Sequence, residues 1–145
     1  MRLIKFIGKY WLILVALIPV TAVAQTSFTN MASDVTNPTK YSGVAMCVQD
    51  MNGDRLDDIV CLDDARNLYI EYQGLNGIWT ELDGPEMDGG NAWGMTAGDA
   101  NNNGYGDVFS GLFGGQPDYA KADATGTNYV VSELPSYGLD TQCVN

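Results

Sequence analysis

The chain has 145 residues, a formal net charge of −11 at pH 7 and no histidine. The length allows one modest domain, and the lack of histidine excludes His-based acid–base catalysis, a Ser–His–Asp triad and His-ligated zinc. A chain this acidic repels nucleic acid and anionic membrane surfaces, so neither is an expected partner.

The first 24 residues have the parts of a secretory signal peptide. Arg2, Lys5 and Lys9 form a basic start, residues 11–23 are apolar, and a small-residue cleavage site ends at Ala24. The alternative is a transmembrane anchor, but the unbroken apolar run is short for spanning a bilayer. We therefore expect cleavage after Ala24, a secreted, periplasmic or extracellular location, and no membrane insertion of the mature chain.

The mature chain then divides into three predicted parts. Residues 25–43 are polar and form an N-terminal segment with a candidate strand at Ser33–Thr36. Two similar stretches follow, at 44–93 and 94–145, and each begins with an apolar run that leads into an acidic loop.

The acidic loop is the most informative feature of the sequence, because it occurs twice, starting 49 residues apart. Counted from the first aspartate, positions 1, 3, 5 and 9 carry side-chain oxygens in both copies. Alternate residues of a tight loop point the same way, so these oxygens and the backbone carbonyl of position 7 can form a cage. An all-oxygen cage suits a hard cation such as Ca²⁺. The predicted metal ligands are Asp50, Asn52, Asp54, Leu56 and Asp58 in the first loop, and Asp99, Asn101, Asn103, Tyr105 and Asp107 in the second.

Two other interpretations of these loops are weaker. Asx and Gly residues also form ordinary turns, but a chance turn does not explain two copies with the same pattern. An EF-hand loop needs a bidentate acid at position 12, where this chain has Cys61 and Ser110. The residues after position 9 are short and β-rich, so each loop is predicted to join two strands.

The two loops and their flanking strands resemble the FG-GAP, or VCBS, repeat of β-propellers, found in integrin α-chains and many secreted bacterial proteins. The resemblance rests on residues 44–60 and 94–109, with a looser likeness at Phe113–Pro117. It implies an all-β fold of antiparallel β-propeller blades, Ca²⁺ as the bound ion, and an unidentified protein or carbohydrate ligand. The first loop departs from the family pattern at position 6, where Arg55 replaces the usual glycine.

The strand pattern agrees with about two blades. Each stretch of about 50 residues contains four short alternating segments, as one blade does; in the first stretch the last two are Leu68–Tyr72 and Ile78–Leu82, followed by a crossover over residues 83–91. Propellers close with roughly four to eight blades, so two form an incomplete propeller. A third loop is due near position 148, and we expect the chain to be the N-terminal piece of a longer protein.

The three cysteines leave two alternatives open. Cys47 and Cys61 lie at equal distances from the first loop, so they either form a disulfide across the hairpin or remain two small residues on one face. Cys143 has no evident partner in the sequence.

The sequence therefore predicts a binding module and no enzyme. The favoured function is a secreted calcium-binding β-propeller repeat for protein or glycan binding and adhesion. The alternative is a non-catalytic accessory propeller of a larger secreted enzyme. A dockerin-like interaction module is less favoured, because position 12 of neither loop is acidic.

Overall fold

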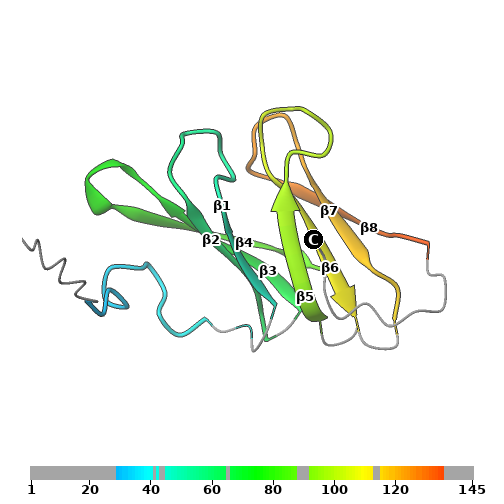
Figure 1. The fold of residues 1–145 in the computed structure, drawn as a ribbon, viewed down its shortest axis with the longest axis horizontal. Coiled ribbons are helices and arrows are strands. Elements are labelled where there is room, and N and C mark those ends of the chain that lie inside the picture. Colours follow the sequence, from blue (N-terminus) through cyan, green and yellow to red (C-terminus); the bar gives the residue numbers. More distant parts are fainter. Residues whose placement is uncertain are drawn as a thin grey trace, which may run out of the picture.

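The structure is a computed structural model that describes residues 29–40, 42, 45–64, 66–87, 92–112 and 115–135. The predicted signal peptide, its cleavage site and Cys143 lie outside these residues. The described part is all-β, with two four-stranded antiparallel sheets side by side (Figure 1). This confirms the predicted fold class of antiparallel blades in an incomplete propeller. In this part of the chain no helix has the length and apolar character needed to cross a membrane.

The first sheet is a simple meander in the order β1-β2-β3-β4. Its strands are β1 Met46–Gln49, β2 Asp58–Asp63, β3 Asn67–Gln73 and β4 Trp79–Glu86, with a short 3-10 turn, η1 Leu75–Gly77, before β4. The pairing of β1 with β2 starts at Gln49 and Asp58, so the first acidic loop fills residues 50–57 and closes a hairpin. The loop thus joins two strands, as the sequence predicts.

The second sheet repeats this arrangement in the order β5-β6-β7-β8. Its strands are β5 Ala92–Gly98, β6 Asp107–Leu112, β7 Asp118–Ala122 and β8 Tyr129–Glu133. Gly98 pairs with Asp107, so the second loop fills residues 99–106. Both loops emerge at the same end of the two sheets (Figure 1).

The core lies between the two sheets. Strand β1 contacts β5 and strand β4 contacts β8, so equivalent strands of the two sheets are neighbours. One apolar cluster takes Val60 and Ile70 from the first sheet and Val108 and Ala120 from the second, each with no exposed surface. The alternation of side chains along each strand places these residues on one face, because successive residues point to opposite faces.

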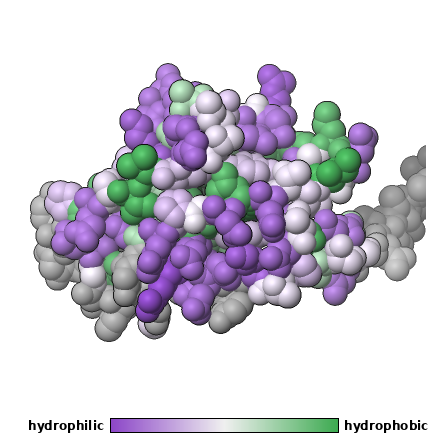
Figure 2. Space-filling view, turned by 180° about the vertical axis from the view of Figure 1, so that it is seen from behind, coloured by the Kyte–Doolittle hydropathy of each residue, from purple (hydrophilic) through white to green (hydrophobic). Residues whose placement is uncertain are grey.

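The surface turned away from the view of Figure 1 is mostly hydrophilic. Its hydrophobic side chains form separate small patches between polar residues (Figure 2). This agrees with the surplus of acidic over basic residues in the sequence.

The N-terminal segment differs from its prediction. Residues 32–36 form turns and bends, so the predicted strand at Ser33–Thr36 is wrong. Local bonds define the turn, since Asp34 N donates to the carbonyl of Met31 (2.8 Å) and Ala32 N donates to Oδ1 of Asn30 (3.0 Å). The predicted crossover also starts too early, because β4 continues to Glu86. Pro85 is tolerated there because β4 is an edge strand.

The structure favours free cysteines over the disulfide. Cys47 and Cys61 are both free, and Cys61 pairs with Met46 while Cys47 pairs with Val60. This register is one residue away from placing the cysteines opposite each other. Their side chains therefore point to opposite faces of the sheet.

Candidate metal centres in the two hairpin loops

The backbones of the two loops turn alike at the same two positions. Both have a positive φ at positions 4 and 6, namely 78° and 72° at Gly53 and Arg55, and 59° and 90° at Asn102 and Gly104. The sequences place glycine at position 4 in one loop and at position 6 in the other, yet the chain turns in the same way. Arg55 thus adopts the left-handed conformation that the resemblance predicts for position 6.

The first aspartate of each loop binds backbone amides of its own loop. In the first loop, Asp50 Oδ1 accepts from Gly53 N (2.8 Å) and Oδ2 accepts from Arg55 N (2.8 Å). In the second, Asp99 Oδ1 accepts from Asn103 N (2.9 Å) and Oδ2 from Gly104 N (2.8 Å). These bonds hold the carboxylate of position 1 against the turn.

Position 5 repeats a second contact in both loops. Asp54 Oδ1 accepts from the amide of Leu56 (2.8 Å), and Asn103 Oδ1 accepts from the amide of Tyr105 (3.0 Å). These two amides belong to position 7, whose carbonyl is a predicted ligand. The side chain of position 5 therefore holds the peptide between positions 6 and 7, which precedes the peptide that carries this carbonyl.

Position 9 is the most buried member of each predicted set. Asp58 and Asp107 have no exposed surface. Asp58 Oδ2 accepts from Met51 N (2.8 Å) and Oδ1 from Gln73 N (2.9 Å) at the end of β3. Each carboxylate thus ties position 2 of its loop to the third strand of its sheet.

The second sheet repeats this clamp. Asp107 Oδ2 accepts from Ala100 N (3.1 Å), and Oδ1 accepts from Ala122 N (2.9 Å) at the end of β7. Asp107 also accepts from the amide nitrogen of Asn101 (2.9 Å) and from Tyr119 Oη (2.9 Å). The sequence pattern gave position 9 only a ligand role and missed its bonds to the third strand, which lies 15 residues further along.

Burial and like charge act on the carboxyl of Asp58. Burial raises its pKa, the amides of Met51 and Gln73 partly oppose this, and the nearby charges of Asp54 and Asp50 raise it further. The net pKa of Asp58 is above its usual value. A bound cation would reverse the effect of the neighbouring negative charges.

The donor chemistry of both loops fits a hard cation. Positions 1, 3, 5 and 9 supply only carboxylate and amide groups, whose oxygens are the ligands that such a cation takes. Oδ2 of Asp107 already accepts from Ala100 N, Asn101 Nδ2 and Tyr119 Oη, so this oxygen would have to release a donor to reach an ion. Within the described residues, no three Asp, Glu or Cys side chains are grouped closely enough to hold a metal ion by themselves. Carbonyl and amide oxygens would therefore have to complete either site.

A second polar cluster, which the sequence analysis missed, lies on the outer face of the first sheet. Glu71 Oε1 accepts from Asn37 N (2.8 Å) and from Tyr69 Oη (2.5 Å), and Oε2 accepts from Thr36 N (3.2 Å). Tyr69 Oη also lies 2.9 Å from Glu81 Oε2. The only signal in the sequence was the spacing of Tyr69 and Glu71, which puts both on one face of β3.

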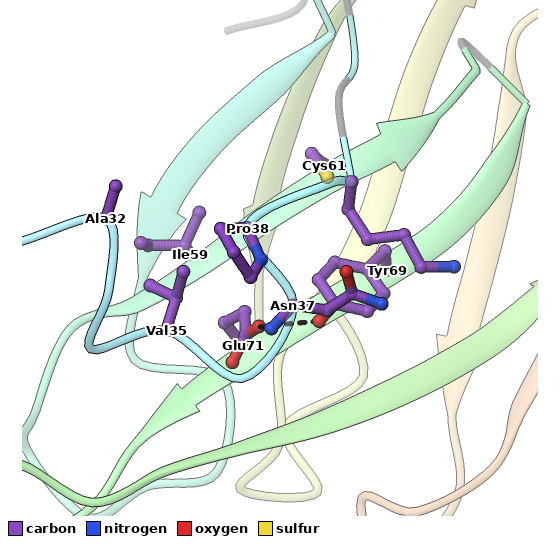
Figure 3. Close-up of a pocket in the computed structure, with 9 residues that line it drawn as sticks. Ala32, Val35, Asn37, Pro38, Ile59, Cys61, Tyr69 and Glu71 are labelled. Atoms are coloured by element: carbon purple, nitrogen blue, oxygen red, sulfur yellow. Dashed lines mark hydrogen bonds between the residues drawn. The ribbon is translucent and has the colours of Figure 1, made fainter.

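This cluster attaches the N-terminal segment to the sheet. Lys40 Nζ lies 2.8 Å from Asp83 and 3.2 Å from Asp63, and 5.0 Å from the centre of the Tyr69 ring. Between segment and sheet is a cavity of ≈180 Å³, with Val35 and Pro38 on one side (Figure 3). The opposite wall is formed by side chains of β2 and β3.

One of the comparisons with known proteins gives a match. Residues 50–110 match the family model described as an FG-GAP-like repeat. The match begins at position 1 of the first loop and ends just beyond position 9 of the second, so it contains both loops. Comparison with curated proteins and with solved structures gives no match.

Proposed function

Because residues 50–110 make this chain an FG-GAP-like repeat protein, we propose that it is a secreted, non-catalytic β-propeller module whose two hairpin loops bind Ca²⁺. The ions stiffen the loops at one end of the sheets, and the module presents its surface to a protein or carbohydrate ligand. The predicted signal peptide supports secretion. The mass of the exported chain tests this step, with Gln25 as the expected first residue.

One observation carries the calcium proposal. Two loops 49 residues apart in sequence share positive φ values at positions 4 and 6, and they share the amide bonds made by positions 1, 5 and 9. The two predicted ligand sets therefore lie on backbones that turn at the same positions, with Asp58 and Asp107 at the start of the following strands. Oxygen ligands in a flexible loop suit Ca²⁺ better than Mg²⁺, which demands near-ideal octahedral geometry.

Each predicted ligand has a definite part in the proposed sites. The carboxylates and amides of positions 1, 3 and 5 would supply side-chain oxygens, and Leu56 and Tyr105 would supply backbone carbonyls. Asp58 and Asp107 would close the sites from the sheet side. A bound ion would screen the repulsion between the loop carboxylates, which lie close together in the sequence.

Isothermal titration calorimetry tests the proposal. We expect calcium binding to the chain, with one site lost in Asp50→Ala and the other in Asp99→Ala, and weaker binding of Mg²⁺. The matched control is Asp57→Asn, which removes an exposed charge from the first loop at a position that is not a predicted ligand. Equal heats in all variants would contradict the proposed sites.

A further inference from the structure

The two loops contact each other directly. Gly106 N, at position 8 of the second loop, donates to the backbone carbonyl of Met51, at position 2 of the first loop (2.8 Å). Met51 has no exposed surface although it belongs to a loop. Two loops far apart in sequence therefore share a backbone hydrogen bond and a buried side chain.

The contact is also closely packed. A Cβ on Gly106 would lie 2.6 Å from the sulfur of Met51, and a Cβ on Gly53 would lie 3.1 Å from the carbonyl oxygen of Gly104. No larger residue fits at Gly106 unless Met51 moves. A shift in one loop must therefore be accommodated by the other.

A short chain of bonds connects the predicted ligands of the two sites. Asp58 Oδ2 accepts from Met51 N, and the carbonyl of the same residue accepts from Gly106 N. Gly106 lies between Tyr105 and Asp107, the predicted ligands at positions 7 and 9 of the second loop. Met51 likewise lies between Asp50 and Asn52, at positions 1 and 3 of the first loop.

On the premise that the loops bind Ca²⁺ as proposed above, we propose that the two sites bind it with positive cooperativity through the Met51–Gly106 contact. An ion in the first loop fixes the peptides on both sides of Met51. The carbonyl of Met51 then holds Gly106, and with it the spacing of positions 7 and 9 in the second loop. The second ion consequently meets a loop that has already lost part of its conformational freedom.

Calorimetry on the whole chain tests the coupling. Asp50→Ala reports the affinity of the second site alone, and Asp99→Ala that of the first site alone. Together they predict the wild-type titration for independent sites. We expect the second binding step of the wild type to be at least about fivefold tighter than this prediction, a typical size of coupling between sites. Asp57→Asn should keep the wild-type curve.

The contact itself is tested by Gly106→Ala, which pushes a methyl group against Met51. The matched control is Gly98→Ala, since a Cβ at Gly98 meets no atom within 4 Å. With circular dichroism to confirm the sheets, Gly106→Ala should bring the titration to the independent-site curve and Gly98→Ala should not.

The possible failures are distinguishable. A wild-type curve equal to the independent-site prediction would overturn the coupling and leave the calcium sites intact. A wild-type chain that binds no calcium would overturn both proposals. The comparison of the wild type with the two aspartate variants decides between these results, whatever the stability of Gly106→Ala.

Discussion

At the scale of single residues, the two loops reach one backbone shape with different glycine placements. Arg55 has a φ of 72°, which a residue with a Cβ adopts only at a cost, whereas Gly104 occupies the equivalent position freely at 90°. The bonds from Asp50 to the amides of positions 4 and 6 help to hold Arg55 in this conformation. Position 6 is therefore strained in the first loop and relaxed in the second. Position 4 has the reverse arrangement, with Gly53 in the first loop and Asn102 at a φ of 59° in the second, although asparagine tolerates this region better than arginine.

We predict that Arg55→Gly stabilises the chain by about 1 kcal/mol and tightens calcium binding at the first loop. The substitution relieves the strained φ and removes a positive charge next to the proposed cation site. Urea denaturation in the presence of a chelator measures the first effect, and calorimetry measures the second. Gly104→Ala should have the opposite sign, because its Cβ meets no atom within 4 Å and only the backbone strain changes. Weaker binding in Arg55→Gly would show that position 6 has another role.

The sequence predicted that each loop joins two strands, and it predicted the turn at position 6, because the pattern behind both predictions is local. The spacing of oxygen side chains and the departure at Arg55 can both be found within ten residues. The clamp made by Asp58 was not predictable from that pattern, since its partner Gln73 lies 15 residues further along, at the end of the neighbouring strand β3. The cysteine prediction also depended on the register of β1 against β2, which the sequence does not give. A shift of one residue in this register reverses the face to which a side chain points.

At the scale of elements, the N-terminal segment is attached to the first sheet mainly by charged groups. The predicted strand failed there because the amides of Thr36 and Asn37 bind the carboxylate of Glu71 and are not available to a neighbouring strand. Nothing in residues 33–36 signals that interaction. Local propensity was overridden by one buried carboxylate that lies in another element.

The carboxyl of Glu71 makes the attachment dependent on pH. Burial alone would raise its pKa, but the bonds from Tyr69 and from the amides of Asn37 and Thr36 outweigh burial, and the pKa is lowered from its ordinary 4.5. The groups around it are Tyr69 on β3, Glu81 on β4 and Lys40 on the segment. A lowered folded-state pKa means that the ionised carboxylate stabilises the fold above pH 4.5. This stabilisation is lost as the pH falls from 4.5 through the folded-state value.

We predict that Glu71→Gln destabilises the chain by about 2 kcal/mol at pH 7, because it weakens hydrogen bonds to a charged group. The difference from wild type should shrink as the pH falls below 4.5. Denaturation curves at several pH values measure it. The control is Glu133→Gln, an exposed glutamate in β8, which should leave stability nearly unchanged. A constant difference between wild type and Glu71→Gln down to pH 2 would contradict this role for ionised Glu71.

At the scale of the whole molecule, the two sheets depend on one shared core. The sequence repeat correctly predicted two similar four-stranded units, since each has the same order of loop and strands. It did not predict how closely the loops pack on each other. Met51 shows why: a methionine inside an acidic loop gives no local sign of burial, yet its side chain has no exposed surface and belongs to the cluster between the sheets.

We predict that Met51→Ala lowers the free energy of unfolding by about 2–5 kcal/mol, the usual cost of removing a large buried side chain, and that both sheets still unfold together. Two variants with a single tryptophan report on the two sheets, and Trp11 is replaced by Phe in both. One variant keeps only Trp79 on β4 for the first sheet, and the other keeps only Trp93 on β5 for the second. Urea unfolding followed by fluorescence should give the same midpoint for both reporters.

Met46→Ala is the matched control, because Met46 is 55% exposed and its loss should change stability by less than about 0.5 kcal/mol. Separate midpoints for the two tryptophans would mean that each sheet folds on its own, and the contact through Met51 would then not join them into one cooperative unit.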